Sequence, residues 1–199
     1  MPDIKETRAL LEDPDAFGTF GRFNETPIGQ MPPQMRAAFD LTKSLRGLVP
    51  GPHKIWAANP ALLTTIAPIG AYYQTDSTLS KAEIEIATLV ICGRWGAAYS
   101  SFEHEKIGVR LGGLDPAQAE ALIAGLPTAF GDPRQQVVYE LSSALAAARV
   151  VPQGLFSRAQ ELLGDAGLTD VTVLMGWFTA VSLTLMAYDV PSNAVGLDQ

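Results

Sequence analysis

Apolar residues recur at helical spacing along most of the chain, and Gly, Pro and Asn divide this pattern into segments. The run Pro50, Gly51, Pro52 predicts a break, and Pro68 predicts a kink inside a longer segment. The predicted helices span residues 4–11, 34–45, 60–73, 81–93, 101–112, 116–125, 133–149, 152–164 and 169–188.

Several of these helices have readable starts. Asn59 before Pro60 predicts a capped first turn, since Asn accepts a free amide proton and Pro has none to lose. Ser80 with Glu83 forms a capping box that predicts a helix start at Lys81. Ser100 with Glu103 repeats the pattern and predicts a second start, with His104 in the first turn of that helix.

The segment from 171 to 187 carries no charge over seventeen residues. Its Val and Thr content would suit strands, and its length is close to that of a membrane span, but its spacing is helical and it contains hydroxyl residues. A buried helix is therefore predicted, with an inner face formed by Val171, Leu174, Met175, Phe178, Ser182 and Leu185. The chain as a whole is predicted to be all-α, with an N-terminal extension over 1–30 and a single helical domain over 31–199.

Composition restricts the partners and the location. The chain has 199 residues, 47% of them hydrophobic, which is enough for one sizeable core. Its formal net charge of -7 and its lack of a Lys/Arg cluster argue against a nucleic-acid partner. A single cysteine, Cys92, excludes an intramolecular disulfide, and the charged N-terminus does not resemble a secretory signal, so we expect a cytoplasmic protein without a membrane partner.

The candidate chemistry centres on a carboxylate and an imidazole. The chain has only two histidines, and His104 follows the turn after an apolar helix that carries Glu85. Histidine is the side chain best suited to exchange protons near neutral pH, so this pair is the leading site hypothesis. His53, between Pro52 and Lys54, is instead expected to be a loop residue.

The residues around this pair resemble a known family. The run LSKAEIEIATLVICGRWGAAYSSFEHEKIGVRLGGL is similar to the core of the carboxymuconolactone decarboxylase family, and GLTDVTVLMGWFTAVSLTLMAYDVP is similar to its closing helix. The resemblance covers roughly residues 34 to 191. It implies the all-helical fold of the alkylhydroperoxidase D-like superfamily, with extra segments at both ends of this chain, and homo-oligomers that are trimers or hexamers.

The peroxidase branch of that superfamily carries a Glu, eleven intervening residues and then Cys-x-x-Cys-x-x-x-His. On this chain the Glu falls on Glu85 and the His on His104, but the cysteine positions fall on Ala97 and Ser100. A dithiol peroxidase needs one thiolate to attack the peroxide and a second to resolve the sulfenic acid. Cys92 lies five residues before the first of these positions and is expected to be a small buried hydrophobic residue.

The resemblance therefore implies the branch without cysteines, which performs cofactor-independent lyase chemistry on small organic acids or lactones. Loss of CO2 from such a substrate leaves a dienolate that must be stabilised and protonated, which requires an acid/base pair and hydrogen-bond donors but no metal. Glu85 and His104 are the candidate catalytic residues. The candidate substrate-binding residues are Arg94, Trp95, Tyr99 and Ser100.

Other functions stay open. The family's Tyr-x-Gly-x-Pro segment is replaced here by LIAGLPTAFGDP, so a different substrate or another proton-transfer reaction is an alternative. A peroxidase-like redox protein would need a second thiol, and a small-molecule-binding protein without catalysis would tolerate replacement of both Glu85 and His104.

Overall fold

The computed structural model describes residues 19–194 and 196, so the helix predicted over 4–11 lies outside the described residues. The chain divides into two compact units: Tyr72–Met186 form unit 2, and the residues before and after them form unit 1. The prediction of an all-α fold is confirmed: the described part is almost entirely helical, with one two-stranded exception. The division into an extension over 1–30 and a domain over 31–199 stays a prediction.

Unit 1 begins with a short hairpin that the sequence pattern did not predict. Strands β1 (Thr19–Phe20) and β2 (Phe23–Asn24) pair antiparallel through a turn at Gly21, where φ is 64°. A side chain at this glycine would come within 2.3 Å of the Tyr188 carbonyl oxygen, and the neighbouring Arg22 amide donates to the same oxygen at 2.6 Å. The hairpin therefore packs against the segment after residue 187 within unit 1.

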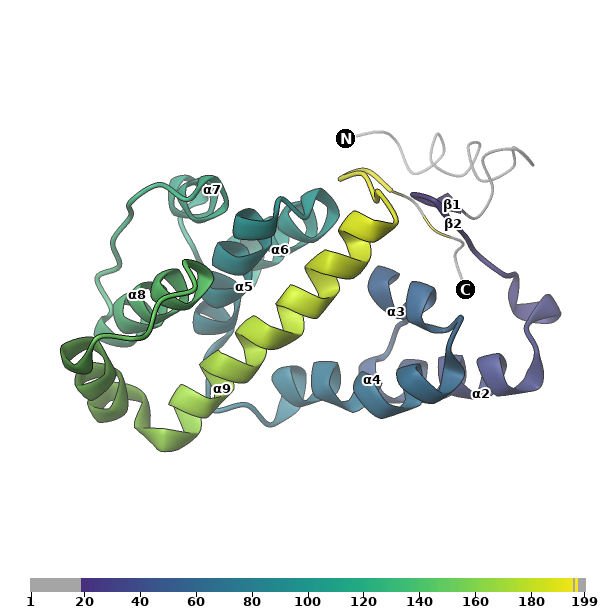
Figure 1. Cartoon of the computed structure of the whole chain (residues 1–199), viewed down its shortest axis with the longest axis horizontal. Coiled ribbons are helices and arrows are strands. Elements are labelled where there is room, and N and C mark those ends of the chain that lie inside the picture. Colours follow the sequence, from purple (N-terminus) through teal and green to yellow (C-terminus); the bar gives the residue numbers. More distant parts are fainter. Residues whose placement is uncertain (1–18, 195, 197–199) are drawn as a thin grey trace. The chain divides into compact units, whose positions relative to one another are not determined.

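Unit 1 has four helical elements among the described residues, of which the two longest begin and end close to the predicted positions and the two shortest were not predicted. They are the 3-10 turn η1 (Ile28–Gln30), α2 (Pro33–Arg46), α3 (Gly51–Trp56) and the first part of α4 (Pro60–Thr75), all drawn in purple to blue in Figure 1. Asn59 accepts the Leu62 amide at 3.2 Å, as expected of a cap, and Gly47 ends α2 in the left-handed conformation.

The expected break at 50 to 52 and the expected loop position of His53 were wrong. Pro50 is the N-cap of α3, and Pro52 lies in its first turn, where a missing amide proton is harmless. His53 is buried in this helix, and burial, assisted by the charge of Arg46, lowers its pKa to about 3. A proline pair can thus start a short helix as well as interrupt one.

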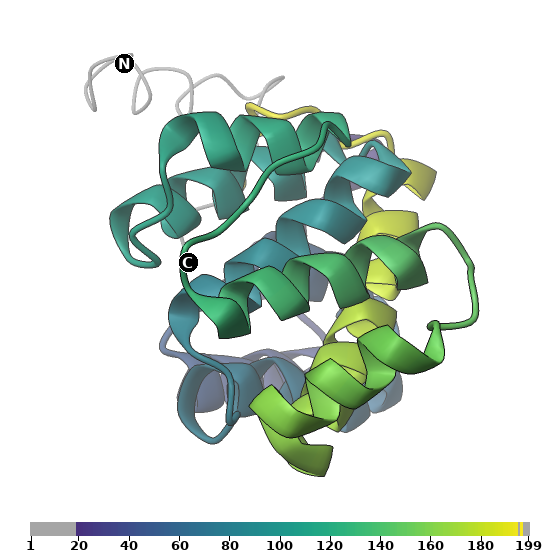
Figure 2. The ribbon, with the colours of Figure 1, turned by 90° about the vertical axis from the view of Figure 1, so that its left-hand side faces the viewer.

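Unit 2 is arranged around α5 (Lys81–Trp95). This helix packs against α6 (Ala98–Arg110), α7 (Pro116–Ala124) and α8 (Pro133–Ala146), as Figures 1 and 2 show. All residues from 82 to 92 are buried, so α5 has neighbours on every side. The capping box of Ser80 and Glu83 is confirmed, with both reciprocal hydrogen bonds present.

The second predicted capping box does not form. Helix α6 begins at Ala98, three residues earlier than predicted, and Ala97 caps it without a side-chain hydrogen bond. Ser100 is therefore inside the helix, where its hydroxyl accepts from the Cys92 thiol at 3.2 Å, and His104 lies in the second turn. The Ser100 hydroxyl thus bonds to the buried Cys92 thiol of α5 and does not cap the start of its own helix.

The last helix, α9 (Gln153–Ala187), is broken at Gly164, where φ is 68° and ψ is 177°. The predicted stop at this glycine is confirmed, but the second segment follows directly instead of starting at Thr169. The predicted inner face is buried as expected, with its six members at Val171, Leu174, Met175, Phe178, Ser182 and Leu185. In length and composition α9 could cross a membrane, yet half of its most apolar window is buried in the protein, as in a core helix.

Asp170 of α9 joins this helix to the end of α4 and the following loop, all within unit 2. Its buried carboxylate accepts hydrogen bonds from the Tyr72 hydroxyl at 2.6 Å, from Ser77 at 3.0 Å and from both the amide and hydroxyl of Thr78 at 2.8 Å. Burial alone would raise the pKa of Asp170, but these donors together lower it. The carboxylate is therefore a structural anchor with its acceptor capacity filled.

A second buried carboxylate joins three helices. Glu83 is 2% exposed, and its carboxylate accepts hydrogen bonds from Nε of Arg134 at 2.8 Å and from Nη2 at 3.2 Å. Nη1 of the same arginine donates to the Leu162 carbonyl at 2.7 Å. One guanidinium thus connects the starts of α5 and α8 with the end of the first segment of α9.

Replacement of Arg134 by Met is expected to lower the free energy of unfolding by about 2 kcal/mol, because it leaves a buried carboxylate without its cation while the partly exposed arginine limits the loss. Urea denaturation at neutral pH measures this change. The control is Arg158→Met, which removes the more exposed pair with Glu140 and is expected to change stability by less than about 1 kcal/mol. Equal losses in the two variants would contradict the structural role of Arg134.

Candidate functional site

The two predicted catalytic residues meet across the α5–α6 hairpin. Nδ1 of His104 lies 2.7 Å from Oε2 of Glu85. The turn between the helices is closed by Gly96 in the left-handed conformation, and Gly108 of α6 lies beside Glu85, since a Cβ atom there would be in ordinary van der Waals contact with Cβ of Glu85 at 3.4 Å. The hairpin thus holds an acid from α5 against an imidazole from α6.

Glu85 is a fully buried charge with two cationic neighbours. Its side chain has no exposed surface, and its Oε1 atom lies 2.7 Å from Nζ of Lys81, one turn earlier on α5. Burial alone would raise the pKa of the carboxyl. The charge and hydrogen bond of His104, together with those of Lys81, outweigh burial and lower the pKa below its ordinary value. Glu85 is therefore ionised at neutral pH.

The ionised carboxylate determines the tautomer of His104. A carboxylate can only accept, so Nδ1 of the imidazole must carry a proton and donate it to Glu85. In the neutral ring, Nε2 then holds the free lone pair. This atom has no hydrogen-bond partner within residues 19–194 and 196, and the side chain is 21% exposed.

The imidazole also contacts α9 through an aromatic ring. The rings of His104 and Phe178 lie 4.8 Å apart at 87°, in an edge-to-face arrangement. Phe178 and its neighbours Met175 and Trp177 are all buried. The hydrogen bond to Glu85 and the contact with Phe178 together limit rotation of the imidazole.

Ser100 and Cys92 form a separate buried contact beside the pair. The thiol has no exposed surface and donates to Ser100, while Ser182 of α9 donates to Sγ at 3.9 Å. Burial raises the pKa of Cys92 to about 11, so the sulfur remains a neutral thiol at neutral pH. Ala97 and Ser100, at the cysteine positions of the peroxidase motif, are also buried, at 2% and 3% exposure.

The other predicted substrate-binding residues do not join the pair. Arg94 donates Nε to the Ala146 carbonyl of α8 at 3.1 Å, on a different face of α5. Trp95 is exposed at the end of α5, and Tyr99 is half-buried in the first turn of α6. Within the described chain, no hydrogen bond, ion pair or ring contact connects these residues to Glu85 or His104. Their assignment as substrate contacts stays a prediction.

Lys81 forms an ion pair with Glu85 but was not among the site residues predicted from the sequence. It precedes Glu85 by four residues on a helix that was correctly predicted, and oppositely charged residues at this spacing are neighbours. The signal was therefore present in the pattern. Phe178 was named from the sequence, but its contact with His104 depends on the tertiary packing of α9.

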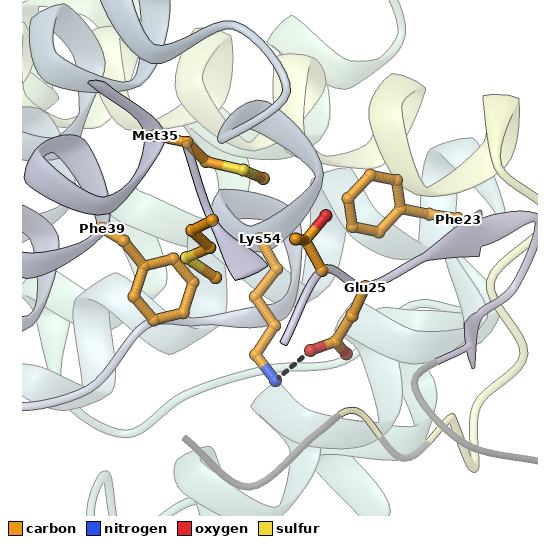
Figure 3. Close-up of a pocket in the computed structure, with 7 residues that line it drawn as sticks. Phe23, Glu25, Met35, Phe39 and Lys54 are labelled. Carbon is orange, nitrogen blue, oxygen red and sulfur yellow. Dashed lines mark hydrogen bonds and ion pairs between the residues drawn. The ribbon is translucent and has the colours of Figure 1, made fainter. Parts of the chain in front are cut away.

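Neither a metal-binding cluster nor the small cavity of unit 1 forms a competing centre among the described residues. Among the described residues, no group of three or more His, Cys, Asp and Glu side chains could hold a metal ion. Unit 1 has a cavity of about 10 Å³, shown in Figure 3, beside the ion pair of Lys54 and Glu25, whose nitrogen and oxygen are 3.0 Å apart. Phe23, Met35 and Phe39 close it, so it has room for about one water molecule.

Comparison with known proteins identifies the fold. No family model matches the chain, and no curated protein matches it significantly. Among solved structures, an uncharacterized peroxidase-related protein from Silicibacter sp. TM1040 is 20% identical, with a TM-score of 0.69 over 89% of this chain and 94% of that one. The debrominase Bmp8 is 12% identical, with a TM-score of 0.64 over 81% of this chain and 87% of that one, and the same values hold for a Cys-to-Ala variant in complex with 2,3,4-tribromopyrrole. These similarities show that the chain shares the all-α fold of these structures, in agreement with the all-α fold predicted from the sequence.

Proposed function

We propose that this protein is an enzyme that transfers protons to and from a small organic acid or lactone, with a decarboxylase-like lyase reaction as its leading form. The observation that supports this most strongly is the His104 ring, bonded through Nδ1 to a buried carboxylate at 2.7 Å while Nε2 has no hydrogen-bond partner among the described residues. An imidazole held in one tautomer with one accessible nitrogen suits a general acid or base.

In the proposed reaction, substrate lies at Nε2 of His104. Loss of CO2 from a carbon conjugated to a lactone or keto carbonyl leaves its electron pair on an enolate, and protonated Nε2 delivers a proton to carbon. The ring then regains a proton from solvent. The Glu85 carboxylate stabilises the imidazolium form without itself taking the proton, because its pKa is lowered.

Lys81 has a supporting role in this proposal. Without it, the ionised Glu85 would give the neutral site a net negative charge, which repels an anionic substrate. With it, the group of Lys81, Glu85 and His104 is neutral when the imidazole is neutral and positive when the imidazole is protonated. The charge therefore favours binding of an organic acid in the state that can donate a proton.

Two other functions remain alternatives. A peroxidase-like role is favoured by the description of one structural neighbour as peroxidase-related, but the single described thiol, Cys92, is buried with a raised pKa. A peroxide-consumption assay with a thiol reductant tests that role. A binding protein without catalysis would keep its ligand affinity when both Glu85 and His104 are replaced.

We also propose that the protein forms a homo-oligomer, trimeric or hexameric, and that it is cytoplasmic. Val173, Leu183 and Met186 of α9 expose between 46 and 48% of their surface, and apolar surface of this kind supports association. Sedimentation analysis of the full chain measures the assembly.

Replacement of His104 by Gln is expected to lower turnover by about 10²- to 10⁴-fold, because it removes the proton-transfer group while keeping a polar side chain of similar size. Glu85→Gln is expected to have a similar effect, since the uncharged amide no longer stabilises the imidazolium. Suitable measurements are CO2 release from a panel of lactone acids and keto acids, and deuterium incorporation from D2O followed by proton NMR.

The matched control for these variants is Glu105→Gln, which removes a carboxylate on the same helix with no hydrogen bond or ion pair within the described residues. It should retain the wild-type rate. Unchanged turnover in the His104 or Glu85 variant, with folding verified by circular dichroism, would remove the proposed mechanism.

Lys81→Met is expected to lower the free energy of unfolding at pH 7 by about 1 kcal/mol, because it removes one cation from buried Glu85 while the exposed lysine limits the effect. Since the folded pKa of Glu85 is depressed, this contribution is present above the ordinary carboxyl pKa and is lost as the pH falls through the folded value. Urea denaturation of both proteins from pH 7 down to pH 3 should show the difference shrinking. A difference that stays constant over this range would show that Lys81 acts through packing and not through the charge of Glu85.

A further inference from the structure

Unit 2 has a large hollow on the face of α5 that carries Arg94. It has a volume of about 540 Å³ and lies between α5, the end of α7 with its following loop, and α8. This volume is within the range of small-molecule sites, which is roughly 300 to 1,000 Å³. The walls are mainly apolar, with Val90 from α5, Leu122, Ile123, Leu126 and Pro127 from α7 and the loop, and Ala146 and Ala147 from α8.

Three polar side chains face this apolar hollow. Arg94 is held through Nε on the Ala146 carbonyl, so its two terminal nitrogens remain as donors, and they have no partner among the described residues. The hydroxyl of Ser143 on α8 also has no hydrogen-bond partner in the described part of the chain, whereas its carbonyl accepts the Ala147 amide. Tyr139, one turn earlier on α8, accepts the Thr128 amide at 3.4 Å and keeps its hydroxyl proton free to donate.

The charge of the hollow differs from that of the whole chain. The formal net charge of the protein is -7, yet no Asp or Glu lines this hollow, and Arg94 is its only charged lining residue. A guanidinium with two free donors on its outer edge matches the geometry of a carboxylate. The backbone carbonyls nearby are mostly satisfied, since the amides of Gly125 and Ala147 cap the ends of α7 and α8.

We infer that this hollow binds a small organic carboxylate with an apolar body. The carboxylate lies on Arg94 with hydroxyl contacts from Ser143 and Tyr139, and the body lies against the walls from α5, α7 and α8. The site is separate from the proton-transfer pair, because Arg94 follows Glu85 by nine residues, which at about 3.6 residues per turn is roughly a half-turn around α5.

Calorimetric titration of the full chain with acetate, butyrate and hexanoate tests the site. Affinity should rise by about fourfold for each added methylene that enters the apolar walls. Arg94→Gln should weaken hexanoate binding by at least about tenfold, because it removes a charge-assisted hydrogen bond. Hexylamine, with the same body and the opposite charge, should not bind.

Two control variants make the result specific. Arg110→Gln removes the same charge from the exposed last turn of α6 and should leave hexanoate affinity unchanged. His104→Gln should also leave it unchanged, which separates this site from the proposed catalytic pair. Ser143→Phe, which fills the hollow, should abolish binding even if Arg94→Gln has other effects.

Several outcomes would overturn the inference. These are the absence of hexanoate binding to the wild type, equal affinity in Arg94→Gln, or loss of binding in His104→Gln with retention in Arg94→Gln. Conversion of an oligomer to monomers by Leu126→Glu, at an exposed residue of the rim, together with no hexanoate binding by the wild type, would identify the face as a subunit contact instead.

Discussion

The buried charge of Glu85 is the constraint on which the rest of unit 2 depends. An ionised carboxylate without exposed surface is strongly unfavourable unless cations and hydrogen bonds compensate it. Lys81 and His104 provide this compensation from one helix turn and from the neighbouring helix, each at 2.7 Å. The compensation also has a chemical consequence, because the same contact that stabilises Glu85 fixes the imidazole tautomer and leaves Nε2 free. One hydrogen bond therefore both stabilises the fold and underlies the proposed proton transfer.

The hydrogen bond between His104 and Glu85 joins two helices, so it depends on tertiary packing and not on the geometry of one helix. The hairpin of α5 and α6 brings His104 to Glu85, and α9 brings Phe178 against the imidazole from 74 residues later in the chain. Two further buried carboxylates, Glu83 and Asp170, hold the ends of these helices through Arg134 and through the loop after α4. In the described part of unit 2, the buried carboxylates of Glu83 and Asp170 thus each accept several hydrogen bonds, whereas the buried carboxylate of Glu85 is bonded to the imidazole of His104.

Much of the fold could be predicted because helix ends have local chemical signals. The Ser80 capping box, the Asn59 cap and the stop at Gly164 depend on residues next to one another, and all three are present. The errors arose where a side chain had a tertiary partner. Ser100 has the sequence of a cap, but its hydroxyl accepts from Cys92, and no local pattern contains that information.

At the candidate site, the predicted contact between Glu85 and His104 is present in the structure, but Arg94 lies on another face of the helix. The meeting of Glu85 and His104 followed from the order of two helices and from a family resemblance, whereas Arg94 was assigned to the same site because it is close in sequence. Nine residues on a helix reverse the direction of a side chain, so helical periodicity already separates Arg94 from Glu85. The spacing of four residues from Lys81 to Glu85 instead places both side chains on the same face of the helix and predicts a contact.

This geometry bears on how an acidic protein can handle an acidic substrate. With a formal net charge of -7, the surface as a whole repels organic anions, so any site for them must create its own local positive charge. The two faces of α5 do so differently. On one face Lys81 offsets Glu85, and the local charge becomes positive only when His104 gains a proton, so binding and proton transfer are linked. On the other face Arg94 is the one charged residue that lines the proposed carboxylate site, and no acidic residue lies beside it in that lining.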